Sequence, residues 1–409
     1  MFLSNDTVFK LKEKYGTPLY VYSESILRQR CREMKNLLPN KKFRVNYSAK
    51  ANTNLEILKI IREEGLDVDA MSPGEIYIEQ LAGFDSSQIF YISNNVSAEE
   101  MRFAIDRNIL VSVDSLSQLE MYGQINPGGK VAVRFNPGKG AGHHEKVITA
   151  GKKTKFGIQK ELIPQVKAIA EKYNLTLAGI NQHIGSLFLD WRDYIDGVCS
   201  FLEIAKEFPN LSFLDLGGGF GVPYKPGESR LDLERLGKEL DIVLTKFLGE
   251  YPKKDIIFKI EPGRYIVAEC GVLLGSVNSV KKSFDTTYIG TDIGFNVLAR
   301  PVMYDSYHEM EIVKKSAGNN GTNKDARIKA TIVGNICESG DILARDREIQ
   351  TAEVGDMLIV YTAGAYGYSM SSNYNCRLRP AEVLIDLNGE DRLIRKRDTL
   401  ESLVQNFPA

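Results

Sequence analysis

Short runs in which apolar and polar residues alternate recur between residues 43 and 263, and amphipathic stretches separate most of them. The first run alternates Phe43, Val45 and Tyr47 with polar residues, a period of two that is typical of a β-strand. Further strand-like runs occur at 66–72, 88–93, 109–115, 131–137, 177–185, 211–219 and 256–263. Helical spacing occurs between them at 73–84, 97–108, 160–173 and 232–251. Strands alternating with helices over about 220 residues predict a (β/α)8 TIM barrel, with an open, doubly wound sheet as the alternative, because periodicity does not show closure.

The pattern changes after residue 270, where strand-like runs follow one another without long helices. Asn388-Gly389 between two such runs indicates a hairpin, and the polar, glycine-rich stretch 314–326 indicates a loop tip. A final amphipathic helix is expected to begin at an Asp398 cap. We therefore predict an α/β barrel with a C-terminal, mostly antiparallel β domain, divided as a 1–25 segment that joins the β domain, a 26–270 barrel and a 271–409 β domain.

The composition excludes several classes of protein. The 409 residues are 43% hydrophobic and 26% charged with a net charge of −1, which gives no electrostatic case for nucleic acid or an anionic membrane. No apolar stretch reaches bilayer length, so no membrane span is expected. The five scattered cysteines indicate free thiols in a reducing cytoplasm, and the adjacent His143 and His144 indicate a polar loop, so we expect no metal site.

Unusual polar residues and glycines lie at the predicted C-terminal ends of the barrel strands, where the βα loops of such a barrel meet. Lys50 follows the first strand, the HIGS stretch 183–186 follows the sixth, the GGGFG stretch 217–221 the seventh, and the EPGR stretch 261–264 the eighth. The glycines would let backbone N–H groups approach a phosphate. A lysine opposite a phosphate site is the arrangement that an aldehyde cofactor requires.

Each of these residues also has a plain structural interpretation. Lys50 alone reads as a surface lysine, the glycines as a tight turn, His183 as a buried core histidine, and Glu261 as the partner of Arg264 in an ion pair. Their shared placement at one end of the barrel is the stronger signal. A carboxylate such as Glu261 beside a pyridine nitrogen would keep that nitrogen protonated.

Seven motifs in order, from residue 18 to about 397, resemble the pyridoxal-phosphate-dependent diaminopimelate decarboxylases, in the fold group of alanine racemase and ornithine decarboxylase. The motifs are YSAKAN, HIGS, GGGFGVPY, EPGRYIVAECG, RPVMYDSYHEM, CESGD and GAYGYSMSSNYN. The resemblance implies decarboxylation of meso-2,6-diaminopimelate to L-lysine and CO2, the last step of lysine biosynthesis, with pyridoxal 5′-phosphate as cofactor. It also implies a homodimer that shares its active sites.

The resemblance assigns roles to individual residues. Catalysis falls to Lys50, which holds the cofactor, to His183, which stacks on its ring, and to Cys337, a proton donor supplied across a head-to-tail dimer. The residues implied to bind the cofactor are Lys50, His183, Ser186, Gly218, Gly219, Glu261, Gly263, Arg264 and Tyr366. The residues implied to bind the substrate are Arg264, Arg300, Tyr304, Glu338 and Tyr366. Without the resemblance, Cys337 would read as a buried structural thiol, and Arg300 and Tyr304 as surface residues.

Other functions stay open at this point. Leu187 and Val297 depart from the family pattern, which admits a decarboxylase of a related basic amino acid or carboxyalkyl polyamine. A cofactor-free regulatory protein would be expected to lose the lysine or the phosphate loop, and this chain keeps both. A racemase would share the barrel, but Glu261 at the pyridine position argues against one.

Overall fold

The computed structural model describes residues 2–39, 41–92, 94–138, 154–314 and 326–408. The chain divides into two compact units. We call them the barrel unit, which contains Arg28–Pro223 and Ser229–Ile266, and the β unit, which contains Met1–Leu27, Tyr224–Glu228 and Val267–Ala409. His143, His144 and nearly all of the loop predicted at 314–326 lie outside the described residues.

Within the described residues, the barrel unit contains a closed ring of eight parallel strands. In pairing order they are β5 (Leu110–Val113), β4 (Ile89–Ile92), β3 (Asp67–Ala70), β2 (Phe43–Ser48), β10 (Ile257–Ile260), β9 (Phe213–Asp215), β8 (Thr176–Asn181) and β6 (Lys130–Asn136). β5 also pairs with β6, and this pairing closes the ring. The (β/α)8 barrel is therefore confirmed, and the open sheet is wrong.

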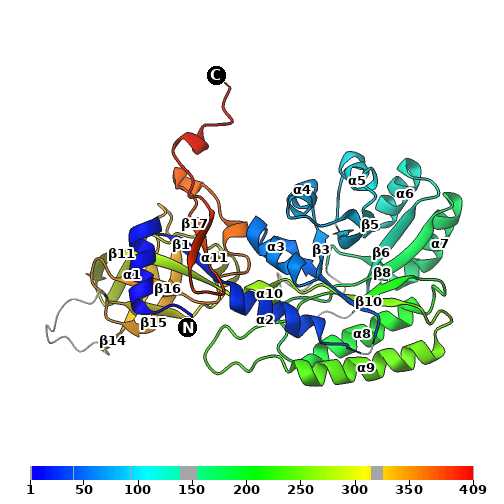
Figure 1. The fold of residues 1–409 in the computed structure, drawn as a ribbon, viewed down its shortest axis with the longest axis horizontal. Coiled ribbons are helices and arrows are strands. Elements are labelled where there is room, and N and C mark those ends of the chain that lie inside the picture. Colours follow the sequence, from blue (N-terminus) through cyan, green and yellow to red (C-terminus); the bar gives the residue numbers. More distant parts are fainter. Residues whose placement is uncertain (1, 40, 93, 139–153, 315–325, 409) are drawn as a thin grey trace. The chain divides into compact units, whose positions relative to one another are not determined.

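Helices lie between the barrel strands along the chain, and most of them begin at a side chain that caps a free N–H group. Asn54 accepts from the Glu56 amide at the start of α3, and Ser97 forms a capping box with Glu100 at the start of α5. The helices are α2 (Glu24–Lys35), α3 (Leu55–Glu63), α4 (Pro73–Leu81), α5 (Ala98–Ile105), α6 (Leu116–Ile125), α7 (Ile163–Lys172), α8 (Trp191–Ala205) and α9 (Leu233–Glu250). Figure 1 shows helices α3 to α9 around strands of the ring. A two-residue strand, β7 (Ile158–Gln159), adds to β6.

The interior of the barrel is packed with side chains. The rings of Phe90 and Phe213 meet edge to face with their centroids 5.4 Å apart, and Ile92 and Ala132 join the same cluster. Lys259 places its Nζ within about 5 Å of both ring centroids, a cation–π arrangement. The barrel is therefore no channel, and ligands must bind at its ends.

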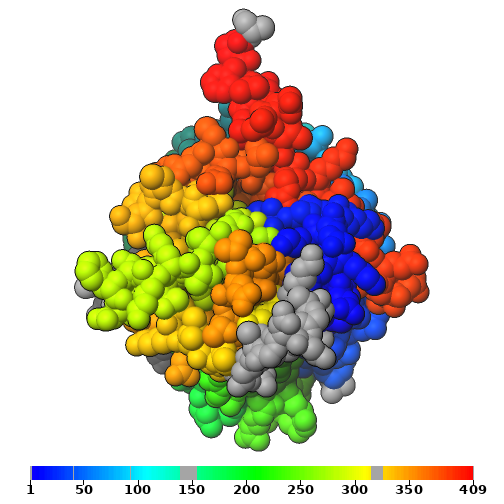
Figure 2. Space-filling view, turned by 90° about the vertical axis from the view of Figure 1, so that its left-hand side faces the viewer, coloured from blue at the N-terminus to red at the C-terminus, as the bar shows by residue number. Residues whose placement is uncertain are grey.

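The β unit is built on a second sheet, which is mostly antiparallel. Its strands are β1 (Leu19–Ser23), β11 (Gly271–Ser283), β12 (Thr286–Thr291), β13 (Met310–Val313), β14 (Arg327–Val333), β15 (Ile342–Gln350), β16 (Met357–Val360), β17 (Ala381–Ile385) and β18 (Asp391–Arg395). β1 runs antiparallel to β11 and parallel to β17, so the N-terminal strand lies inside this sheet. Figure 2 shows the N-terminal residues, in blue, beside later segments of the β unit. These residues include helix α1 (Asn5–Tyr15), whose Val8 and Leu11 pack into the core cluster of the sheet.

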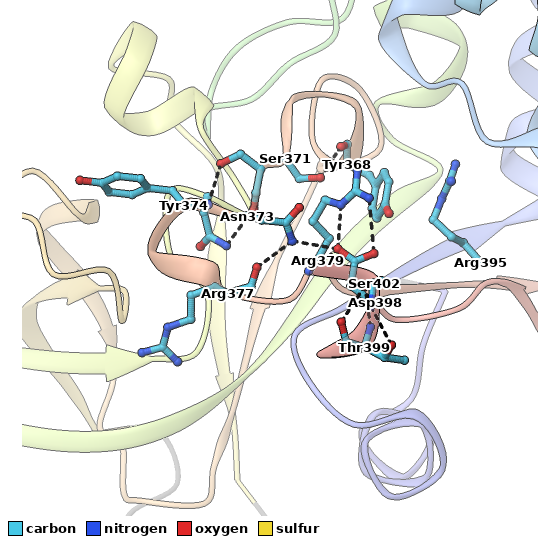
Figure 3. A network of polar contacts seen from close by, with 12 residues as sticks. Tyr368, Ser371, Asn373, Tyr374, Arg377, Arg379, Arg395, Asp398, Thr399 and Ser402 are labelled. Carbon is cyan, nitrogen blue, oxygen red and sulfur yellow. Dashed lines mark hydrogen bonds and ion pairs between the residues drawn. The ribbon is translucent and has the colours of Figure 1, made fainter. Parts of the chain in front are cut away.

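The predicted hairpin at Asn388-Gly389 is present, because β17 and β18 pair antiparallel on either side of it and Gly389 has a φ of +83°. The predicted final helix with its cap at Asp398 is wrong. Thr399 and Ser402 cap each other's amides at the start of a short 3₁₀ turn, Glu401–Leu403. The Asp398 carboxylate instead accepts from Arg379 and Asn373, as Figure 3 shows.

Among the described residues, no helix is long and apolar enough to cross a membrane. All five cysteines fall in described parts of the chain, and none forms a disulfide.

Candidate active site

Lys50 lies where strand β2 ends. A single 3₁₀ turn, Ala49–Ala51, carries it, and its two alanine neighbours are buried while Lys50 is exposed. β2 pairs in parallel with β10, and the Ser48 amide donates to the Pro262 carbonyl at 3.2 Å. Because adjacent parallel strands end at the same edge, Lys50 and Glu261 lie at the same end of the barrel.

The glycine turn after β9 lies at this end as well. A Cβ on Gly218 would come within 1.9 Å of the Glu261 carbonyl oxygen, so only glycine allows this close approach, and Gly219 has a φ of +106°. The Gly218 amide donates to Nδ1 of His183 at 3.2 Å. His183 Nδ1 is therefore an acceptor, and the ring is held in one orientation beside the glycine turn.

The His183 ring is neutral for a physical reason. Burial lowers its pKa well below 6.5, and the positive charges of Lys50 and Arg134 lower it further. A neutral flat ring at the mouth of the barrel is suited to stacking on an aromatic ligand.

The turn that follows β10 adds a cation. Arg264 begins the short helix α10 (Arg264–Val267) and donates from Nη2 to the Ser186 hydroxyl at 3.3 Å. The Ile266 amide donates to the Gly263 carbonyl. Leu187, one of the two departures from the family pattern, donates its amide to the Gly219 carbonyl and has a φ of +70°. The predicted cofactor residues of the barrel unit, namely Lys50, His183, Ser186, Gly218, Gly219, Glu261, Gly263 and Arg264, thus lie on neighbouring strand ends.

The carboxyl of Glu261 is buried, and its Oε1 has no hydrogen-bond partner among the described residues. Burial raises the pKa of Glu261 well above 4.5, the charges of Asp215 and Asp69 and a hydrogen bond with the Asp215 carboxyl raise it further, and Lys50 lowers it. A buried carboxyl oxygen without a hydrogen-bond donor costs free energy unless a ligand supplies one. A ring nitrogen with a proton would do so.

Sequence reasoning missed three charged residues inside this end of the barrel. Burial raises the pKa of Asp69 to about 8, although Lys50 and the Ser48 hydroxyl oppose the rise. Burial likewise raises the pKa of Asp215 and lowers that of Arg134. In the sequence, each of these residues is a charged residue within a predicted strand. Such a residue indicates a site only once the barrel is known to be closed, because closure buries its side chain.

Glu79, on α4, is a further buried acid. Its side chain is fully buried, and neither carboxylate oxygen has a partner among the described residues. Burial raises its pKa from 4.5 to about 9, with contributions from Asp69 and Glu75.

Glu79→Gln is expected to stabilise the protein increasingly as the pH rises. Below a pH of 4.5 the carboxyl is protonated in both the folded and the unfolded chain, but between 4.5 and about 9 only the folded chain keeps the proton, so wild-type stability falls across that interval. Urea unfolding should show the advantage of the variant growing by about 4 kcal/mol from about pH 5 to about pH 8. Glu99→Gln, on an exposed position of α5, is the control. An advantage that is the same at both pH values would contradict this prediction.

The predicted substrate residues outside the barrel lie in the β unit. Arg300 and Tyr304 are four residues apart on the single turn of helix α11 (Arg300–Tyr304), so they share a face; Arg300 is buried and Tyr304 half-buried. Cys337 and Glu338 are exposed on the turn between β14 and β15. Tyr366 is half-buried and has a φ of +56°.

The turn that carries Cys337 is held by the segment 373–377. The Cys337 amide donates to Oδ1 of Asn375 at 2.8 Å, and Arg377 donates to the Asn335 carbonyl at 2.9 Å. Figure 3 shows how Asn373 connects this segment to Asp398. A thiol on a turn fixed in this way, at the surface, is not the buried structural thiol that the residue type alone suggested.

The residues of the barrel end fit pyridoxal 5′-phosphate. The glycine turn admits a phosphate close to the backbone, and His183 offers a neutral ring. Glu261 offers a carboxyl oxygen that has no donor among the described residues, and Lys50 offers an amine.

The family model for pyridoxal-dependent decarboxylases, pyridoxal binding domain, matches residues 24–268. The chain therefore belongs to the pyridoxal-dependent decarboxylases, and its cofactor is pyridoxal 5′-phosphate. It is 40% identical over 410 residues to a diaminopimelate decarboxylase of Methanothermobacter thermautotrophicus, covering 98% of this chain and 94% of the relative.

Solved structures agree with the sequence relatives. A crystal structure of diaminopimelate decarboxylase matches with a TM-score of 0.91 and 32% identity over 99% of this chain and 96% of the other. Another, from M. jannaschii in complex with L-lysine, matches with a TM-score of 0.88 and 32% identity over 98% and 94%. Within the pyridoxal-dependent decarboxylases, the chain belongs to the diaminopimelate decarboxylase family.

Proposed function

We propose that this protein is a carboxy-lyase that converts meso-2,6-diaminopimelate to L-lysine and CO2 with pyridoxal 5′-phosphate, the last step of lysine biosynthesis. The observation that carries the proposal is that Lys50 and the buried carboxyl of Glu261 lie on adjacent strand ends, with Oε1 of Glu261 lacking a hydrogen-bond donor among the described residues. The substrate is supported by relatives that are named diaminopimelate decarboxylase and by one solved in complex with L-lysine.

The cofactor residues would act as follows. Lys50 carries the aldehyde of the cofactor, His183 stacks on its ring, and Glu261 keeps a proton on the ring nitrogen. When bound, pyridoxal phosphate supplies a conjugated ring that takes up the electron pair left at Cα after CO2 departs. The remaining residues of the cofactor set hold the phosphate and the ring, namely Ser186, Gly218, Gly219, Gly263, Arg264 and Tyr366.

The substrate residues would orient the bond that breaks and then return a proton. Arg264, Arg300, Tyr304 and Tyr366 bind substrate carboxylates with charge-assisted hydrogen bonds, and Glu338 accepts from the far ammonium group. Cys337 donates the proton to Cα. Because buried binding groups are costly to leave unpaired, lysine and ornithine should be poor substrates.

We also propose that two copies form a homodimer in which Cys337 of one copy serves the other. The exposed position of Cys337 and Glu338 supports this arrangement. Mixing a Lys50→Ala protein with a Cys337→Ala protein should restore activity through mixed dimers, and a fully active monomer in sedimentation would contradict it.

A cytoplasmic location is supported by the absence of disulfides among the five cysteines. Activity recovered outside the cytoplasmic fraction would contradict that location.

Arg300→Ala is expected to raise KM for diaminopimelate about 100-fold. It should also lower the preference of the enzyme for diaminopimelate over L-lysine, because the buried charge-assisted hydrogen bond to the substrate carboxylate is lost. The measurement is steady-state CO2 release from diaminopimelate, L-lysine and L-ornithine. Arg192→Ala, at an exposed ion pair with Asp190, is the matched control. If Arg300→Ala hardly changed these values, a substrate without a second carboxylate would be indicated instead.

A further inference from the structure

The function proposed above gives no role to His308, the only histidine in the described part of the β unit. It lies between α11 and β13, four residues after Tyr304, and only 1% of it is exposed. Its ring contacts the side chain of Arg300 and the backbone of Tyr361. Nε2 lies 2.8 Å from Nη1 of Arg300, and Nδ1 lies 2.9 Å from the Tyr361 carbonyl oxygen.

These two partners determine the protonation of the ring. A guanidinium has donors and no acceptor, so Nε2 must present its lone pair to Arg300. A carbonyl has no donor, so Nδ1 must carry the hydrogen that it shares with Tyr361. Only the neutral Nδ1–H form of His308 makes both contacts. In this form the ring is a rigid bridge from the backbone beside β16 to the guanidinium of Arg300.

The backbone of His308 is itself fixed. Arg347, on β15, donates from Nη1 to the His308 carbonyl at 2.9 Å. The Tyr361 amide donates to the Glu309 carbonyl at 2.9 Å, which continues the pairing of β13 with β16. The backbone that carries the Nε2 acceptor of His308 is therefore fixed to the sheet by hydrogen bonds.

Tyr224 contacts both members of the pair. Its ring centroid lies 4.6 Å from Cζ of Arg300, a cation–π contact, and 5.3 Å from the His308 ring at an interplanar angle of 82°. Tyr224 is 7% exposed, and its amide donates to the Glu228 carboxylate at 2.8 Å, which closes the short segment 224–228. The guanidinium is thus held by a hydrogen bond and by an aromatic face.

We propose that His308 and Tyr224 are positioning residues that fix the guanidinium of Arg300 for the substrate's far carboxylate. This inference rests on the proposed function, because it assumes that Arg300 binds that carboxylate. Decarboxylation removes one carboxylate of diaminopimelate and leaves the other on L-lysine. L-lysine binding therefore reports on the same contact without any reaction.

Two substitutions at position 308 separate positioning from simple packing. His308→Gln can place an amide oxygen near the Nε2 position and keep an acceptor for Arg300. His308→Asn is shorter, so its amide lies near the Nδ1 position and the acceptor for Arg300 is lost. Because a hydrogen bond to a charged group is broken only in the second, His308→Asn should weaken L-lysine binding and raise KM for diaminopimelate about 10- to 100-fold, against less than about threefold for His308→Gln.

Further measurements make the test independent of folding and of the reaction. Cadaverine lacks carboxylates, so the wild type and both variants at position 308 should bind it with the same affinity. For diaminopimelate, kcat of both variants should stay within about threefold of the wild-type value. Tyr224→Leu removes the aromatic face and should raise KM about 3- to 30-fold even if His308→Asn fails to fold. Tyr307→Phe is the matched control, because the Tyr307 hydroxyl donates to Glu309 and takes no part in the contact with Arg300.

The outcomes distinguish this inference from the function beneath it. If Arg300→Ala weakens L-lysine binding and His308→Asn does not, the positioning role is wrong and the proposed function stands. If Arg300→Ala itself leaves L-lysine binding unchanged, the role of Arg300 in the proposed function is wrong. Equal losses in His308→Gln and His308→Asn, with cadaverine affinity lost as well, would show that His308 only packs.

Discussion

Lys50→Arg is expected to abolish decarboxylation, with a loss of at least about 10⁴-fold in kcat. The substitution keeps a positive charge at the end of β2, but a guanidinium stays protonated and cannot attack an aldehyde. The measurements are CO2 release and the visible absorbance of the cofactor that stays with the protein after gel filtration. Borohydride should fix the cofactor to Lys50 in the wild type and leave the variant unlabelled.

The control for this experiment is Lys59→Arg. Lys59 lies on α3, nine residues further along, where it pairs with Glu56 at the surface. This variant should keep wild-type activity and label. Activity of Lys50→Arg within about tenfold of the wild type would contradict the role of Lys50, because a residue that carries the cofactor cannot be replaced so cheaply.

Glu261→Gln is expected to lower kcat by about 10²- to 10³-fold, the usual cost of removing a group that stabilises developing charge. The amide fits the same space but cannot hold a proton on the ring nitrogen by its charge. Without cofactor, burial, Asp215 and Asp69 raise the pKa of Glu261, so the folded protein keeps a proton that the unfolded chain has released above a pH of 4.5. The cofactor-free variant should therefore be at least as stable as the cofactor-free wild type at about pH 8.

The account therefore expects Glu261→Gln to lower activity without lowering the stability of the cofactor-free protein. A loss of activity accompanied by a loss of cofactor-free stability would indicate a structural carboxyl. Unchanged activity would contradict the pairing of Glu261 with the cofactor. Glu228→Gln gives no useful control, because Glu228 closes the segment that holds Tyr224; Glu250→Gln, at an exposed ion pair with Lys206, is suitable.

The barrel could be predicted because its strands are locally encoded. Alternation at 43–49 and glycine turns at strand ends are properties of neighbouring residues, and the parallel order of the strands follows from the helices between them. Periodicity alone could not show closure, since closure depends on the first strand, β2, pairing with the last, β10, which lies more than 200 residues further along the chain. The Asp398 cap failed for a similar reason, because Arg379 and Asn373 offer that carboxylate stronger partners than a helix N-terminus.

The candidate site divides along the same line. Lys50 and Glu261 follow strands directly, so strand order alone brings them to one end. Asp69, Asp215 and Arg134 gain their meaning only from the closed interior, where burial changes their pKa values. His308 and Tyr224 are 84 positions apart in the numbering, and only tertiary structure brings both onto Arg300.

The central claim is that a pyridoxal cofactor held between positions 50 and 261 removes CO2 from a substrate with two carboxylates. Its most direct test is to incubate the purified, cofactor-loaded protein with meso-diaminopimelate and, separately, with L-lysine and L-ornithine, and to measure CO2 and amine products. The account predicts one CO2 and one L-lysine per diaminopimelate consumed, with little release from the other two. No release from diaminopimelate, with turnover of L-lysine or L-ornithine, would contradict it.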